Sequence, residues 1–157
     1  IGWNNSFTFG KGWDANVFFR GSFGHDLLNS NRGFYENTES TTVANYNIVN
    51  TKYYNPAVAK AVVNSYHVED ASFFKLDNMS IGYSFDMANN KAISSLRLYV
   101  AGQNLFTITD YTGIDPEVRY VDDGDGGEDN NALAPGIERR NTYFTTRTFT
   151  IGLTVGF

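Results

Sequence analysis

Nine residues at the end of the chain, Phe149-Thr-Ile151-Gly-Leu153-Thr-Val155-Gly-Phe157, alternate strictly between large apolar side chains and threonine or glycine. Because a β-strand sends successive side chains to opposite faces, this segment predicts a strand with one apolar face and one small, polar face. Such a strand fits a sheet that meets lipid on one side and a polar lumen on the other. The last strand of a soluble β-sandwich alternates too, so this segment alone leaves both interpretations open.

The composition narrows the class of protein. The chain has 157 residues, no long apolar run and no basic-then-apolar leader, so neither a transmembrane helix nor a signal peptide is predicted. The absence of cysteine excludes disulfides, thiol catalysis and thiolate metal sites. A net charge of -5 without a basic stripe argues against nucleic acid as a partner. The chain opens at Ile1 inside a strand pattern, so we expect a cut end there.

Alternation predicts four further strands, over about 1–9, 13–23, 72–85 and 95–109, beside the closing strand at 145–157. The turn Gly10-Lys-Gly12 joins the first two as a hairpin, because glycine tolerates the positive φ of tight turns. In the third strand the apolar parity changes near Asp77-Asn78, which predicts a β-bulge. The pair Asn55-Pro56 before an apolar run predicts a short helix over 57–63.

The connections between these strands alternate in length. Short turns lie at 10–12 and 86–94, and long aperiodic segments lie at 24–70 and 110–143. Outer-membrane barrels place short turns on the periplasmic side and long loops outside, whereas a soluble sandwich has no reason to sort loops in this way. Aromatic residues also gather near the short turns, as an interfacial girdle does. These residues are Phe9, Trp13, Tyr83, Phe85 and Phe157.

Three blocks resemble one protein family. Ala71–Tyr83 (ASFFKLDNMSIGY), Leu96–Tyr111 (LRLYVAGQNLFTITDY) with Gly113–Glu117 (GIDPE), and Thr146–Leu153 (TRTFTIGL) are similar to the C-terminal strands of SusC/RagA-type TonB-dependent transporters of Bacteroidetes. The block Gly102–Thr107 (GQNLFT) is the most specific of them. The closing strand also resembles the C-terminal signal by which bacterial outer-membrane barrels are inserted. That signal comprises Phe149, Ile151, Leu153, Val155 and Phe157.

The resemblance implies an all-β fold, the last five antiparallel strands of an outer-membrane barrel of about 22 strands with two long extracellular loops. It implies an internal plug, energy from the TonB complex through an N-terminal part, and a SusD-like surface lipoprotein as lid. The cargo is expected to be a glycan, with an oligopeptide of the RagA type as the alternative. Five strands cannot close a barrel, so the plug and the remaining strands are expected upstream of Ile1.

Catalysis finds little support in the sequence. The chain contains no Gly-x-Ser-x-Gly or His-Glu-x-x-His motif, and its two histidines, His25 and His67, fall in a predicted loop. We interpret both histidines as solvated loop residues and do not predict an enzyme. A structural or adhesive β-protein remains the alternative to a transporter segment.

The second long segment is strongly acidic, with eight of the 17 acidic residues between Asp110 and Asp129. Asp122, Asp123 and Asp125 are candidate ligands for Ca²⁺, which prefers several hard oxygens on a flexible loop. Their spacing is not that of an EF-hand, and a solvated loop tip is the alternative. No other cofactor is expected.

Candidate substrate contacts lie where the fourth strand ends. Asp110, Tyr111 and Tyr120 combine a carboxylate with aromatic rings, which suits sugars through hydroxyl acceptance and stacking. The tyrosines could equally pack against a neighbouring loop. We expect both long segments to contact the SusD-like lid, because the first carries tyrosines of the kind that interfaces favour. These are Tyr46, Tyr53, Tyr54 and Tyr66.

Overall fold

A computed structural model describes residues 1–38, 51–60, 62–89, 92–117, 136–138 and 144–157. The chain divides into two compact units. The sheet unit comprises Ile1–Ser22, Phe73–Ile108 and Thr145–Phe157, and the loop unit comprises Phe23–Ser72 and Thr109–Phe144. Strands dominate the regular structure, which confirms the prediction of a β-protein. Among the described residues, no helix is long and apolar enough to cross a membrane.

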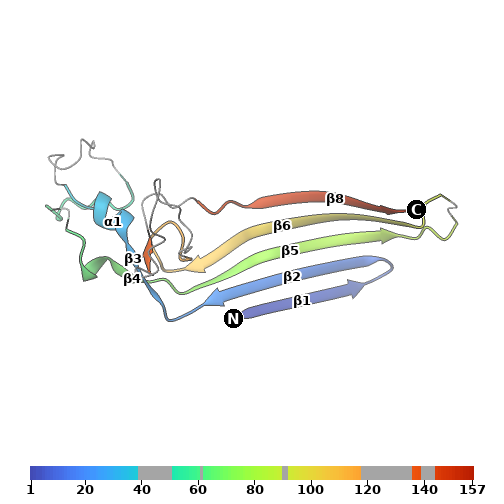
Figure 1. The fold of residues 1–157 in the computed structure, drawn as a ribbon, viewed down its shortest axis with the longest axis horizontal. Coiled ribbons are helices and arrows are strands. Elements are labelled where there is room, and N and C mark those ends of the chain that lie inside the picture. Colours follow the sequence, from blue (N-terminus) through green and yellow to red (C-terminus); the bar gives the residue numbers. More distant parts are fainter. Residues whose placement is uncertain (39–50, 61, 90–91, 118–135, 139–143) are drawn as a thin grey trace, which may run out of the picture. The chain divides into compact units, whose positions relative to one another are not determined.

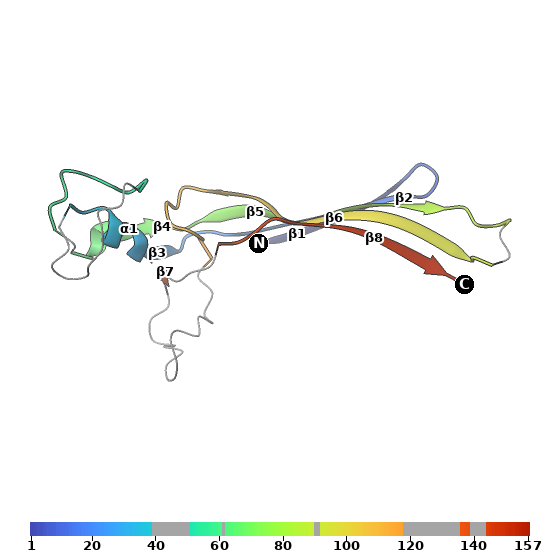
Figure 2. The same ribbon diagram turned by 90° about the horizontal axis from the view of Figure 1, so that it is seen from above.

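The sheet unit is a single layer of five strands that follow one another in the order β1-β2-β5-β6-β8 (Figure 1). Their bounds are Gly2–Phe9 (β1), Trp13–Ser22 (β2), Phe73–Phe85 (β5), Ser95–Thr109 (β6) and Thr148–Gly156 (β8). Antiparallel ladders join β1 to β2, β2 to β5 and β6 to β8. Figure 1 shows β5 and β6 running in opposite directions. Seen from above, the strands keep to one twisted layer whose edges are β1 and β8 (Figure 2).

The predicted parity change in β5 is a β-bulge. Phe18 pairs with Asn78, but the next residue, Phe19, pairs with Leu76, so Asp77 is the extra residue. Because one extra residue exchanges the faces of everything beyond it, the apolar side chains on the two sides of the bulge share one face of the sheet. These side chains are Phe74 and Leu76 before the bulge and Met79, Ile81 and Tyr83 after it.

A second irregularity, which the parity pattern did not predict, lies in β6 at Asn104. Its φ is +53°, and among described residues it is the single non-glycine residue with a positive φ. The side chain of Leu105 lies over Gly102, where a Cβ atom would approach it to 2.7 Å. In a regular strand, residues three apart face opposite ways, so Asn104 places Leu105 on the face of Gly102. The Asn104 Nδ2 also donates to the Thr146 carbonyl at 3.2 Å.

The loop unit contains more regular structure than its aperiodic sequence predicted. Its elements are β3 (Asp26–Asn29), α1 (Ser30–Tyr35), the 3-10 helix η1 (Ser65–His67), β4 (Val68–Asp70) and β7 (Ile137–Glu138). The three strands form a small sheet in the order β4-β3-β7. The pairing of β3 with β4 is antiparallel, and that of β3 with β7 is parallel. Because β7 comes from the second long segment, the sheet joins both segments.

The helix predicted over 57–63 is wrong for the described residues, since 51–60 form turns and 62–64 have no regular structure. Asn55 does cap a turn, because its Oδ1 accepts from the Ala57 N–H at 3.0 Å and its carbonyl accepts from the Val58 N–H. The Val58 carbonyl, however, accepts from the Thr38 N–H at 2.8 Å instead of serving a next helical turn. A tertiary hydrogen bond therefore replaces the helical one.

We predict that Asn104→Val destabilises the full-length protein far more than Asn104→Gly. A β-branched residue at positive φ costs about 1–3 kcal/mol of folding free energy, whereas glycine adopts this conformation freely. The glycine variant lacks the hydrogen bond from the Asn104 side chain to the Thr146 carbonyl. The measurement is the midpoint temperature of thermal unfolding. Gln103→Val on the same strand is the control, and equal effects at 103 and 104 would contradict the prediction.

Candidate functional site

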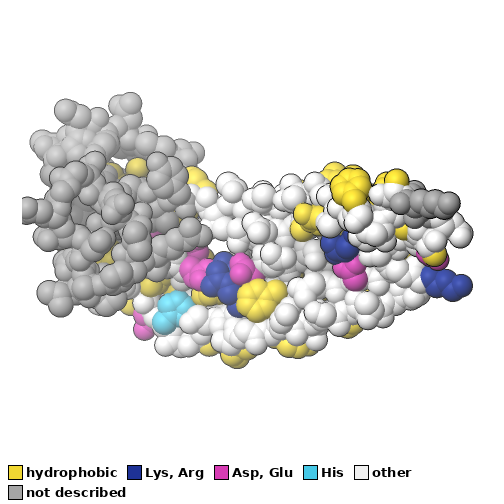
Figure 3. Space-filling model, turned by 45° about the vertical axis from the view of Figure 1, so that its right-hand side comes forward, with side chains coloured by type: hydrophobic (Ala, Val, Ile, Leu, Met, Phe, Trp, Pro, Cys, Tyr) yellow, Lys and Arg dark blue, Asp and Glu magenta, His cyan; other side chains and the backbone are white. Residues whose placement is uncertain are grey.

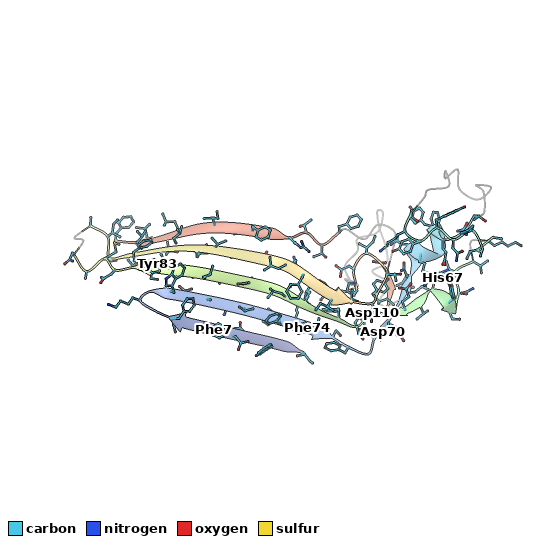
Figure 4. The ribbon with its side chains drawn as sticks, turned by 180° about the vertical axis from the view of Figure 1, so that it is seen from behind. Phe7, His67, Asp70, Phe74, Tyr83 and Asp110 are labelled. Carbon is cyan, nitrogen blue, oxygen red and sulfur yellow. The ribbon has the colours of Figure 1, made fainter. Side chains whose placement is uncertain are left out.

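One face of the sheet unit is apolar and uncovered. The register places Trp3 opposite Phe19, Phe7 opposite Ala15, and Ile151 opposite Val100. Phe7, Phe74 and Tyr83, from β1 and β5, belong to this face and are labelled in Figure 4. Thirteen large side chains of this face are exposed, with exposed fractions between 38% and 92%. Those exposed side chains are Trp3, Phe7, Phe9, Trp13, Met79, Ile81, Phe85, Leu98, Val100, Phe149, Ile151, Leu153 and Phe157.

Aromatic rings form two rows across this face. One row, next to the short turns, runs from Phe9 to Trp13, then to Tyr83 and Phe85, with ring centroids 4.8–6.3 Å apart. The other row stacks Trp3 on Phe19 at 5.6 Å and Phe19 on Phe74 at 5.4 Å. Trp13 and Phe19 are six residues apart on β2, which corresponds to about 20 Å along the strand. A mostly aliphatic band that also includes Phe7 therefore lies between two aromatic rows, the pattern of a barrel wall in a bilayer.

The opposite face carries polar side chains that pair with one another. The Arg97 guanidinium crosses above Gly82 and donates through Nε to Asp14 Oδ1 at 2.9 Å, so this ion pair links β6 to β2 over β5. Since Arg97 lies on this face, its neighbours Leu96 and Leu98 lie on the apolar one. Figure 3 shows a mostly white surface on which dark-blue and magenta atoms lie next to one another.

Two further contacts tie neighbouring strands on the polar face. Arg20 donates to the bulge residue, Asp77, at 3.0 Å, and the Lys75 ammonium lies 3.6 Å from the same carboxylate. Nearer the short turns, the Asn16 amide donates to Ser6 at 2.8 Å. Charged groups that face a lumen keep water and polar partners, whereas on the other face they would meet the exposed apolar band.

In the loop unit, Thr112 of the second segment binds the first segment through all of its polar groups. Its N–H and hydroxyl donate to Glu69 at 2.9 and 2.7 Å, and its carbonyl accepts from the Tyr53 hydroxyl at 2.6 Å. Arg32 donates to the same Glu69 carboxylate at 3.0 Å. Burial alone would raise the pKa of Glu69, but the hydrogen bonds from Thr112 and Arg32 outweigh it and hold that pKa below its usual range.

Glu138 is the most deeply buried charged residue of the described part, with 1% of its surface exposed. Its Oε1 accepts from the Ile114 and Asp115 N–H groups at 2.6 and 2.8 Å, and its Oε2 accepts from the Tyr111 hydroxyl at 3.0 Å. The Asn31 amide, from the first segment, donates at 3.4 Å. Burial, followed by the nearby Glu138 charge, raises the pKa of Tyr111 far above its usual value.

The residues predicted to contact substrate or Ca²⁺ differ in where the structure places them. Asp110 is exposed directly after β6, whereas Tyr111 is buried and packs with Leu27 and Ala71. Its predicted contact with substrate stays a prediction, but the structure gives its hydroxyl a partner within the loop unit. Tyr120, Asp122, Asp123 and Asp125 lie outside the described residues. Within the described ranges, no group of three or more carboxylates and histidines is placed to hold a metal.

The interpretation of His67 as a solvated residue is wrong. His67 is buried, with its Nε2 3.5 Å from Glu36 and its Nδ1 accepting from the Asn64 N–H at 3.3 Å. His25 is half-buried, and its Nε2 lies 3.1 Å from the Pro116 carbonyl. The polar contacts of Asn29, Glu69, Thr112 and Glu138 were also missed, because they join residues far apart in the sequence and leave no local pattern.

Comparison with known proteins places the chain in a family. No family model matches it. It is 34% identical, over its whole length, to TonB-dependent receptor P3 of Formosa agariphila, of which it spans 16%. Over 60% of its length it is 32% identical to TonB-dependent receptor SusC of Bacteroides thetaiotaomicron, of which this part spans 8%.

Solved structures agree on the fold. A structure of the RagAB peptide transporter matches 92% of this chain with a TM-score of 0.64 and 21% identity, over 16% of the matched chain. The RagAB peptide importer in its 'closed-closed' state gives a TM-score of 0.66 at 24% identity, again over 16% of that chain. The chain thus spans about one sixth of the proteins that it matches over its length. It belongs to the TonB-dependent receptors of the SusC/RagA type, as its sequence motifs predicted.

Proposed function

We propose that this chain forms part of the wall and the extracellular mouth of an outer-membrane active importer that works with a SusD-like lipoprotein lid. The observation that carries the proposal is the two-sided sheet, with an uncovered apolar face between aromatic rows and an opposite face of paired charges. In this assignment the apolar face meets lipid. The polar face lines the lumen.

The open edges of the sheet support a larger barrel. β1 and β8 each have a partner on one side, and hydrocarbon does not tolerate a row of unpaired N–H and C=O groups. We assign the missing neighbours to the other strands of a barrel of about 22 strands, as in outer-membrane transporters with a plugged lumen. The plug and the segment that contacts the TonB complex belong to other parts of that receptor.

The proposed cargo is a glycan. Asp110 is an exposed carboxylate at the end of β6, and exposed tyrosines such as Tyr54 lie in the loop unit. Carboxylates accept hydrogen bonds from sugar hydroxyls, and aromatic rings stack on sugar faces. An oligopeptide is the second candidate, because the structures that match the fold are those of the RagAB peptide transporter. We keep Ca²⁺ at Asp122, Asp123 and Asp125 as a minor proposal.

We predict that Ile151→Arg lowers the outer-membrane level of the full receptor, whereas Thr150→Arg does not. Ile151 lies in the middle of the proposed lipid face, where arginine costs about 2–4 kcal/mol at the bilayer midplane. Thr150 is the adjacent residue on the proposed lumen face. The measurement is the amount of heat-modifiable receptor in outer-membrane fractions. Loss with Thr150→Arg and normal levels with Ile151→Arg would reverse the assignment of the faces.

If the loop unit contacts the lipoprotein lid, removing exposed apolar side chains from this unit should reduce co-purification of the lipoprotein with the receptor. The double variant Tyr54→Ser/Val62→Ser changes two exposed residues whose side chains suit an interface core. It should reduce the yield of lipoprotein that co-purifies with the tagged receptor. Lys60→Ser, at another exposed position, is the control. Unchanged co-purification of the double variant would count against lid contact through this surface.

The cargo proposal is tested with the receptor–lipoprotein complex and defined mixtures of oligosaccharides or oligopeptides. We expect binding and TonB-dependent uptake of oligosaccharides. Asp110→Asn should weaken that binding about tenfold, since a hydrogen bond to a charged group contributes about 1.5–3 kcal/mol. Asp86→Asn, in a short turn, should leave it unchanged. Uptake of oligopeptides alone would establish the alternative cargo.

A further inference from the structure

We propose that the described parts of the two long segments, 23–38, 51–60 and 62–72 of the first and 109–117 and 136–138 of the second, move as one body during transport, with Glu138 and Thr112 as the positioning residues that join them. The inference rests on the proposed function for its transport consequence, but its physical basis lies within the loop unit. Two independent loops at a barrel mouth would each carry their own contacts. Here the two segments share a buried apolar cluster, a strand ladder and a hydrogen-bond network.

The apolar core of the loop unit is shared. Its buried cluster consists of Leu27 and Ala71 from the first segment and Tyr111 from the second. Separation of the segments would expose all three side chains to water. A core of this small size has no second cluster among the described residues to hold either segment by itself.

The small sheet is shared as well. β7 pairs with β3, through Leu28 opposite Ile137 and Asn29 opposite Glu138. The Leu28 N–H also donates to the Gly136 carbonyl at 2.7 Å. Since a two-residue strand has no stability of its own, β7 depends on the first segment for its conformation.

Glu138 then connects this strand to residues 111–115, which follow β6 in the sequence. Among the described residues, three donors to Glu138 (the Ile114 and Asp115 N–H groups and the Tyr111 hydroxyl) belong to the second segment, and a fourth, the Asn31 amide, belongs to the first. These four described donors are uncharged, so their contribution to the buried carboxylate depends on their geometry. A movement of β3 and α1 away from β7 would break this arrangement.

Thr112 forms the second connection between the two segments. Its N–H, hydroxyl and carbonyl bind Glu69 and Tyr53, and Asn29 donates to its hydroxyl at 3.1 Å. Asn29 is fully buried and also donates to Glu69, so one hydrogen-bond network reaches from β3 to the residues after β6. Any ligand or lid contact on one segment should therefore be transmitted to the other.

A disulfide across the β3–β7 ladder tests the single-body movement. Leu28→Cys/Ile137→Cys changes Cα partners, whose separation in a ladder suits a disulfide, and the chain has no cysteine of its own. In the full receptor with other cysteines replaced, the oxidised variant should import labelled substrate as well as the reduced one. Loss of uptake on oxidation, restored by reductant, would overturn the proposal. Asn5→Cys/Val17→Cys within the β1–β2 ladder controls for oxidation itself.

Hydrogen exchange of the full receptor in detergent tests the coupling without transport, so failure of the proposed function would leave this result valid. Glu138→Gln should accelerate exchange in 26–35 of the first segment as well as in 111–117 of the second. Acceleration confined to the second segment would overturn the proposal. Asp110→Asn is the exposed control. Should Glu138→Gln fail to fold, Thr112→Val is the milder variant, with the same expected and contrary outcomes.

Discussion

The register between neighbouring strands is the constraint on which the sheet unit depends, because a slip of one residue would exchange its two faces. The bulge at Asp77 keeps Phe74 and Leu76 in phase with the rest of the apolar face. The extra residue also supplies the carboxylate that Arg20 binds at 3.0 Å. One irregularity therefore keeps the apolar face continuous and provides a charge partner on the other face.

The loop unit is held together differently. Its buried apolar cluster has three members, whereas its buried polar residues include Asn29, Asn31, Glu36, His67 and Glu138. Buried polar groups are costly unless their hydrogen bonds are satisfied, and each of these has at least one partner from elsewhere in the unit. A network of this kind adds little to the free energy of unfolding. Its main effect is to favour the one arrangement of the unit in which every buried polar group has a partner. Such an arrangement suits segments that must present a defined surface.

The sequence predicted the sheet unit well and the loop unit poorly, for a physical reason. Strand parity is a local property, so the alternation around Ile151 or the parity change at Asp77 can be recognised without knowing which strands pair. The contacts of Glu138 with Ile114 and Asn31 join residues 24 and 107 positions away, and no local pattern encodes them. The failed helix after Asn55 has the same cause, since the Val58 carbonyl serves Thr38 rather than its own helix. His67 was misjudged because the sequence does not show Glu36 beside it.

Two of the motifs in the family resemblance, Gly102–Thr107 and Gly113–Glu117, have structural roles in this chain. In Gly102–Thr107, Asn104 adopts positive φ and the Leu105 side chain covers Gly102, so a larger residue at 102 would displace it. In Gly113–Glu117, the N–H groups of Ile114 and Asp115 hold the Glu138 carboxylate. The first motif fixes the local geometry within β6, and the second joins the two long segments through Glu138.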